Sequence, residues 1–244
     1  MQRRRDVQKK TLQTIAGATV FAVAMGFIEA AVVIYLREIY YPAGFKFPLQ
    51  AIAGDIARVE LLRELATMIM LLSAGLLAGR TRYEKGAYFI YCFGVWDLFY
   101  YVFLKLLVGW PDSLLTWDIL FLIPTIWTGP VLAPCMNSFA MIAVAYVIFY
   151  SVDKHRLTGF GPAVWSLFIA GAVIILISYL QGSVQHMARH VGYSQFVGAF
   201  CAGKAAALAW TYVPSRFNWP LFSAGTALHL AALALYCRSA FRRG

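Results

Sequence analysis

The sequence LQTIAGATVFAVAMGFIEAAVVIYL, residues 12–36, decides the class of fold because it holds one charged side chain, Glu29, in about 25 residues. A helix of this length rises by about 1.5 Å per residue and crosses the roughly 30 Å hydrocarbon core of a bilayer with some tilt. A basic start before an apolar run is also typical of a signal peptide, and residues 22–24 fit a cleavage site. The apolar pattern continues to Leu36, which favours an uncleaved membrane helix.

The composition extends this interpretation to the whole chain, since 61% of the 244 residues are hydrophobic and 13% are charged. Soluble domains contain about 45–50% apolar and about 25% charged residues. No polar segment is long enough to fold alone, so residues 1–244 are predicted to form a single integral membrane domain. We expect an all-α, polytopic transmembrane helix bundle with six spans, at residues 12–36, 59–78, 87–108, 117–150, 163–180 and 219–237.

The fourth of these segments is irregular. Residues 117–150 are longer than one straight span and shorter than two spans with a turn. Gly129, Pro130 and Pro134 interrupt the run, and proline removes a backbone donor and clashes with the preceding helical turn. We expect a half-helix over 117–127, a break at 128–134 and a continuation to 150. A single tilted, proline-kinked helix is the alternative. Discontinuous helices also build substrate sites in transporters.

Two polar or small-residue segments follow the fifth span. His186 and His190, in the stretch 181–194, are predicted to be solvated loop residues. Residues 196–213, with Lys204 in the middle, are expected to lie in the interface, to re-enter or to cross. His229 is expected to be a packing residue.

No cofactor or metal site is predicted. A helix would place His186 and His190 on one face, but a third zinc ligand is not evident. The cysteines lack metal-binding spacing and are expected to be small buried hydrophobic residues. They are Cys92, Cys135, Cys201 and Cys237.

The net charge of +10 is concentrated next to the apolar runs. With six spans, one side of the membrane carries 13 basic and three acidic residues, which account for the whole net charge. This pattern predicts a multi-pass protein of an inner (plasma) membrane with both termini cytoplasmic. It predicts contact with anionic lipid headgroups at that face rather than binding of nucleic acid. The basic clusters are residues 3–10, 80–85, 154–156 and 238–243.

Charged side chains also occur within or beside the apolar runs, where each costs about 2.5–3.5 kcal/mol at a helix centre. Glu60, Arg63 and Glu64 share one face of the second span because they are three and four positions apart. Further acids in or beside the spans are Glu29, Asp97 and Asp118.

The third span has its own polar face. Asp97, Tyr101 and Lys105 follow each other at four-residue intervals. Asp97 and Lys105 are therefore about 12 Å apart along the helix axis and need partners on other helices.

Our leading hypothesis is that this chain binds or passes a small cation or proton through an outward-facing acidic cavity. Glu29, Glu64 and Asp97 would surround the cavity and carry the ion. Burial and neighbouring charges would set their affinity for it. The remaining predicted site residues are Glu60 and Asp118 as further acidic groups, and Arg63, Tyr101 and Lys105 as groups that tune the charge.

Two alternatives stay open. In the first, the charges are structural ion pairs, with Glu60 or Glu64 bound to Lys105 and Asp118 capping a helix. The protein would then be a non-catalytic scaffold or an accessory subunit that docks a membrane partner. In the second, Glu60 and Glu64 face one ion in a carboxylate-metal membrane enzyme, although an enzyme is the less favoured class.

Three stretches carry a resemblance to known sequences. They are FGVWDLFYY at 93–101, LTWDILFLIP at 115–124 and WTGPVLAP at 127–134. They resemble an uncharacterised group of bacterial polytopic inner-membrane proteins, over about residues 26–134. The resemblance implies a bacterial inner-membrane location. The group has no assigned activity, so the resemblance implies no catalytic residues.

Overall fold

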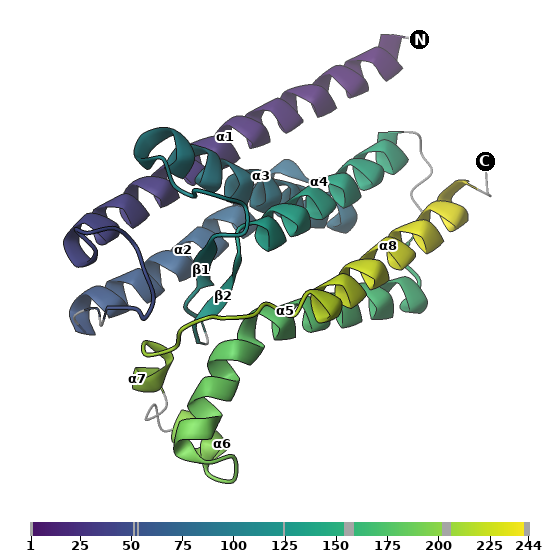
Figure 1. Ribbon diagram of the computed structural model, residues 1–244. Helices are drawn as coiled ribbons and strands as arrows, with labels where there is room; N and C mark the ends of the chain where they lie inside the picture. Colours follow the sequence, from purple (N-terminus) through teal and green to yellow (C-terminus); the bar gives the residue numbers. More distant parts are fainter. Residues whose placement is uncertain are drawn as a thin grey trace.

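The computed structural model describes residues 2–50, 52, 54–123, 125–153, 159–201 and 206–241. It contains six helices that are long and apolar enough to cross a membrane, which confirms the predicted all-α bundle (Figure 1). The chain is therefore described as a multi-pass membrane protein. The six helices are α1 (Gln2–Tyr40), α2 (Gly54–Ala78), α3 (Arg82–Val108), α4 (Leu132–Asp153), α5 (Pro162–Val191) and α8 (Trp219–Phe241).

Several helices extend beyond the apolar runs that predicted them. Thr81 begins α3 with a capping box, in which its hydroxyl accepts from the amide of Glu84 and the Glu84 carboxylate accepts from the amide of Thr81. The fifth helix continues to Val191, so His186 and His190 lie on a helix and the prediction of a loop was wrong.

The fourth segment is broken as expected, but its first part is not a half-helix. Residues 117–130 form an antiparallel hairpin of β1 (Trp117–Phe121) and β2 (Trp127–Pro130), with Asp118 opposite Gly129 and an irregularity between Ile119 and Phe121. Gly129 and Pro130 disfavour a helix, and pairing of the strands satisfies backbone groups that lipid would leave unpaired. Pro134 lies in the first turn of α4, where no backbone donor is lost.

The helices form two groups that the hairpin joins (Figure 1). Helix α3 packs against α1, α2 and α4, whereas α5 packs against α8. Both groups use glycine for close approach. A Cβ at Gly94 of α3 would lie 2.7 Å from the Ser138 carbonyl oxygen of α4, and one at Gly225 of α8 would lie 2.8 Å from the Gly171 carbonyl oxygen of α5. Small residues at such contacts are typical of membrane helix packing.

The segment 196–213 contains two short helices, α6 (Phe196–Cys201) and α7 (Ala206–Ala209). Neither is long enough to cross a bilayer, which favours the interfacial or re-entrant alternative over a crossing one. Lys204 and the cluster at 154–156 lie outside the described residues.

The ends of the chain as described, at α1 and α8, lie at the same end of the bundle (Figure 1). We call this the terminus end, and the end where α1 stops and α2 begins the opposite end.

Candidate functional site

A cavity of about 110 Å³ lies between α1, α2, α3 and β1, and all five predicted ion-binding carboxylates line it. A cavity needs roughly 10–15 Å³ to hold one water molecule, so this one has room for several. Arg37 and Arg63 are the two guanidinium groups in its wall, and Tyr101 also lines it. The carboxylates are those of Glu29, Glu60, Glu64, Asp97 and Asp118.

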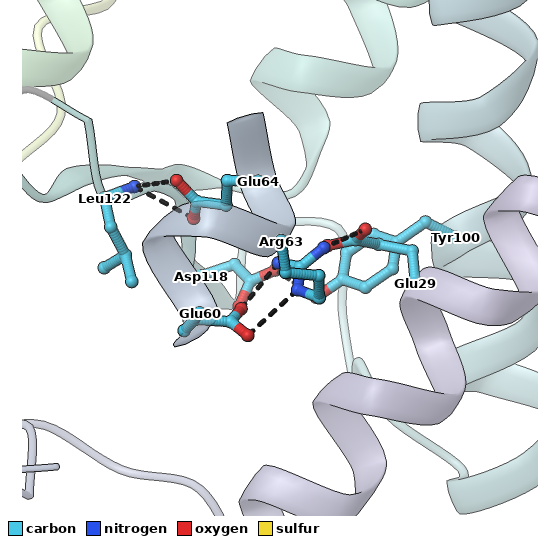
Figure 2. Close-up of polar contacts among 7 residues, drawn as sticks. All are labelled: Glu29, Glu60, Arg63, Glu64, Tyr100, Asp118 and Leu122. Carbon is cyan, nitrogen blue, oxygen red and sulfur yellow. Dashed lines mark hydrogen bonds and ion pairs between the residues drawn. The ribbon is translucent and has the colours of Figure 1, made fainter. Parts of the chain in front are cut away.

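Arg63 holds two of these acids, from different helices (Figure 2). Its Nε donates to Glu60 Oε2 at 2.9 Å and its Nη2 to Glu60 Oε1 at 2.5 Å, a bidentate pair within α2. Its Nη1 donates to Glu29 of α1. The structural alternative predicts that Lys105 binds Glu60 or Glu64. Glu60 is instead paired with Arg63, and this ion-pair cluster links α1 to α2.

Glu64 faces the hairpin instead (Figure 2). Both of its carboxylate oxygens accept from the backbone amide of Leu122, each at 3.1 Å. Leu122 follows β1 directly, so the acid on α2 supplies the hydrogen bond that this amide lacks in the ladder. Glu64 is thus a buried acid whose described partner is a neutral donor.

Asp97 of α3 has a neutral partner too. The Ser138 hydroxyl of α4 donates to its Oδ2 at 2.6 Å. Its neighbour Trp96 also lines the cavity and is 5% exposed, and the indole Nε1 of Trp96 has no hydrogen-bond partner among the described residues. A buried donor in the wall of a cavity with room for water is suited to a bound water molecule.

Asp118 lies on β1 rather than at a helix start, so the expected helix cap is wrong. It is 2% exposed and accepts from Arg37 Nη2 of α1 at 3.0 Å and from the Tyr100 hydroxyl at 3.4 Å. Burial raises the pKa of Asp118, and Arg37 opposes that shift. The Arg37 guanidinium also lies against the rings of Phe45 and Trp110, at 4.5 and 3.9 Å from their centroids.

Lys105 does not line the cavity, contrary to the prediction. Its Nζ donates to the carbonyl oxygens of Gly109 and Pro111, both at 2.8 Å, and so closes the end of α3. The second cation of the site is Arg37, which the sequence reasoning missed because the apolar run stops at Leu36. Helix α1 in fact continues to Tyr40 and carries Arg37 along the cavity wall.

The histidines that the sequence analysis considered do not line the acidic cavity. His186 and His190 have ring centroids 4.4 Å apart on α5, and His186 Nε2 is hydrogen-bonded to Thr211 Oγ1 at 2.9 Å. His229 Nε2 is hydrogen-bonded to the Phe168 carbonyl oxygen at 3.1 Å. In the part of the chain that the structure describes, no group of three or more His, Cys, Asp or Glu residues is arranged to hold a metal ion.

The cavity wall therefore contains three more carboxylates than guanidinium groups. An unpaired ionised carboxylate in a medium of low dielectric is very costly and is neutralised by a proton or by a cation. Chemically, the arrangement suits binding of positive charge together with a few water molecules. No protein-family model, curated protein or solved structure matches this chain.

Proposed function

We propose that this membrane protein takes up protons or a small cation from the solution at the opposite end of the bundle, binds them in the acidic cavity and passes them across the membrane. The observation that carries the proposal is the convergence of five carboxylates, from three membrane helices and β1, on one cavity with two guanidinium groups. The excess of carboxylates over guanidinium groups requires protons or cations that neutralise it.

Glu64 and Asp97 are the groups assigned to exchange. Arg63 neutralises one charge among Glu29 and Glu60, and Arg37 neutralises Asp118. Glu64 and Asp97 accept from neutral donors, and neither forms a salt bridge among the described residues. Because the described residues offer no three-ligand metal cluster, we favour protons over a tightly coordinated divalent ion.

A second hollow supplies the route to solvent. It measures about 280 Å³ and shares Arg37, Tyr41 and Phe45 with the acidic cavity. Glu38 and Asp112 lie in its wall and favour the approach of cations. With both termini cytoplasmic in a bacterial inner membrane, as charge and resemblance predict, this route opens to the outside. Arg37, bound to Asp118, stands between the two hollows.

The test is proton flux into proteoliposomes that contain a pH-sensitive dye, under an imposed pH gradient. We expect the wild-type protein to dissipate the gradient, and Asp97→Asn and Glu64→Gln each to slow it about tenfold, since each removes an exchangeable charge. Asp55→Asn is the matched control, because Asp55 is on the same helix as Glu64 and its side chain is 96% exposed. Size-exclusion profiles report whether each variant is folded.

The assay is repeated with sodium and potassium gradients, which identifies the ion that moves. Unchanged flux of that ion in both cavity variants would refute the proposal, as would wild-type flux no faster than in empty liposomes for protons, sodium and potassium alike. The structural role is the second candidate, and it is favoured by the three carboxylates that are held in salt bridges. It predicts no wild-type flux and loss of stability when those pairs are broken.

A further inference from the structure

We propose that a second site, a crevice between the two helix groups, binds an acyl chain of an anionic phospholipid. The crevice measures about 530 Å³ and lies between α3, α4, α5 and α8, apart from the acidic cavity. Its floor is built of small and aliphatic residues, including Gly86, Ile90, Ala140 and Val144. This proposal does not depend on the proposed ion binding.

The dimensions of the crevice match one leaflet of a bilayer. Its lining on α3 runs from Arg82 to Ile90, and its lining on α4 from Ile148 to Ala140. Eight residues of helix span about 12 Å, and half of the hydrocarbon core is about 15 Å. The crevice thus runs from the terminus end of the bundle toward the middle of the membrane.

The lining is apolar apart from Arg82 and Tyr83 at the mouth and His229, whose Nε2 is hydrogen-bonded to the Phe168 carbonyl oxygen, so the hollow is poorly suited to water. The α5–α8 pair contacts the rest of the bundle mainly through the hairpin, where β2 packs against α5. Contacts between α4 and α8 are fewer. Within a bilayer, the apolar group available to fill the crevice is the acyl chain of a lipid. A chain bound there would contact both helix groups beside the few direct contacts that they make with each other, such as that of Val147 of α4 with the α5–α8 cluster.

The mouth of the crevice is suited to an acidic headgroup. Arg82 is exposed there, and its Nη2 donates to the Tyr83 hydroxyl at 2.8 Å while its guanidinium lies 4.8 Å from the Tyr83 ring centroid. Phe160 packs edge-on against both Tyr83 and Trp165 at the same mouth. Aromatic rings with a cation are typical of the level of the headgroups, and a cation near the surface attracts anionic lipid.

The first arm of the test fills the crevice. The purified full chain is stripped of lipid in detergent, and binding of dioleoylphosphatidylglycerol is followed by native mass spectrometry. We expect one tightly bound lipid in the wild type and about tenfold weaker binding in Gly86→Leu. A Cβ at Gly86 meets no atom within 4 Å, and Gly86 lies in the lining, so a leucine there is expected to extend into the crevice. Gly17→Leu is the control, because Gly17 is equally open but lies on α1 outside the crevice.

The second arm tests the headgroup. Arg82→Gln should weaken phosphatidylglycerol binding about fivefold and leave dioleoylphosphatidylcholine binding unchanged. Arg80→Gln, at the same end of the bundle but outside the crevice, is the control. Equal binding of phosphatidylglycerol to Gly86→Leu and Gly17→Leu would overturn the site. Equal binding of both lipids to the wild type would overturn the anionic preference. If Gly86→Leu does not fold, Ala172→Phe fills the crevice from α5.

Discussion

The acidic cavity and the crevice differ in size and, more importantly, in the charge of their walls. The acidic cavity measures about 110 Å³ and contains five carboxylates, whereas the crevice measures about 530 Å³ and carries a single cation at its mouth. The smaller hollow is suited to water and positive charge, and the larger one to hydrocarbon. Side-chain chemistry, not volume, therefore decides what each hollow holds.

The largest loss of stability is expected when Arg63, a cation of the acidic cavity, is removed. Arg63→Ala leaves Glu29 and Glu60 without their shared cation, and removing one partner of a buried ion pair costs about 3–5 kcal/mol. We expect a fall of this size in the free energy of unfolding, measured by denaturation in mixed detergent micelles. Arg58→Ala is the control on the same helix, since the Asp55–Arg58 pair is exposed and should contribute little.

The outcome can be cross-checked by neutralising the acids. Adding Glu29→Gln to Arg63→Ala should recover part of the lost stability, because one uncompensated charge disappears. A double variant that is less stable than Arg63→Ala by the full effect of Glu29→Gln alone would show that the two groups do not interact.

Arg37→Met should produce a smaller, pH-dependent loss, because it leaves one carboxylate, Asp118, without its cation. Burial raises the pKa of Asp118 above its unfolded value, and removal of Arg37 raises it further. The folded variant then binds a proton more readily than the unfolded chain. Its stability deficit is therefore absent below the unfolded pKa of about 3.9 and grows as the pH rises through the folded pKa. Denaturation at pH 5 and pH 8 measures this difference.

Arg37→Lys serves as the charge-conserving control for that variant. It should keep most of the stability at both pH values, because an ammonium group still compensates Asp118. A deficit in Arg37→Met that is the same at both pH values would mean that the lost contacts with Phe45 and Trp110, not the charge, account for the effect.

These charged contacts also show how much of the molecule can be predicted from its sequence. The six spans follow from the length of the apolar runs, and the joint position of Glu60, Arg63 and Glu64 follows from the period of a helix. The hypothesis that acids from three spans surround one cavity assumed that the polar faces of these helices point into the bundle. Glu29, Glu64 and Asp97 do line one cavity.

The hairpin and the partners of Asp118 and Lys105 could not be predicted, because they depend on contacts between residues far apart in the sequence. An apolar run with Gly129 and Pro130 indicates a break, but not the hairpin that forms there. Its contacts come from other helices: Glu64 of α2 accepts from the Leu122 amide, and the Ser183 hydroxyl of α5 donates to the Ile126 carbonyl oxygen. The partner of Asp118 is Arg37, 81 positions away, because α1 continues past its apolar run. Lys105 instead finds carbonyl acceptors in its own loop.

Glu64→Ala tests the hydrogen bond that links α2, in the wall of the acidic cavity, to the hairpin. It removes the acceptor of the Leu122 amide, and an unsatisfied buried donor costs about 1–3 kcal/mol. We expect the Leu122 amide to exchange with deuterium at least tenfold faster, as measured by hydrogen exchange, while amides in the middle of α8 stay unchanged. Asp55→Ala, in the exposed first turn of α2, should leave the exchange of Leu122 as it is. Equal protection of Leu122 in Glu64→Ala and wild type would mean that Glu64 does not hold the hairpin.

The smallest expected effect is a change in stability when the crevice is filled by a side chain. It tests whether the crevice, unlike the acidic cavity, is suited to hydrocarbon. Replacing glycine by leucine within a helix contributes up to about 1 kcal/mol through helix propensity alone. Gly86→Leu and Gly17→Leu share that gain, and both positions are sterically open. Only position 86 lies in the lining of the crevice, where a leucine is expected to reach the walls of α4 and α5, so lipid-free Gly86→Leu should be the more stable of the two in detergent. Added phosphatidylglycerol should raise the melting temperature of Gly17→Leu more than that of Gly86→Leu at the same lipid concentration, because the added side chain occupies part of the space of the acyl chain and weakens binding. A lipid-induced shift of equal size in both variants would mean that the lipid stabilises the bundle from its outer surface and not from the crevice.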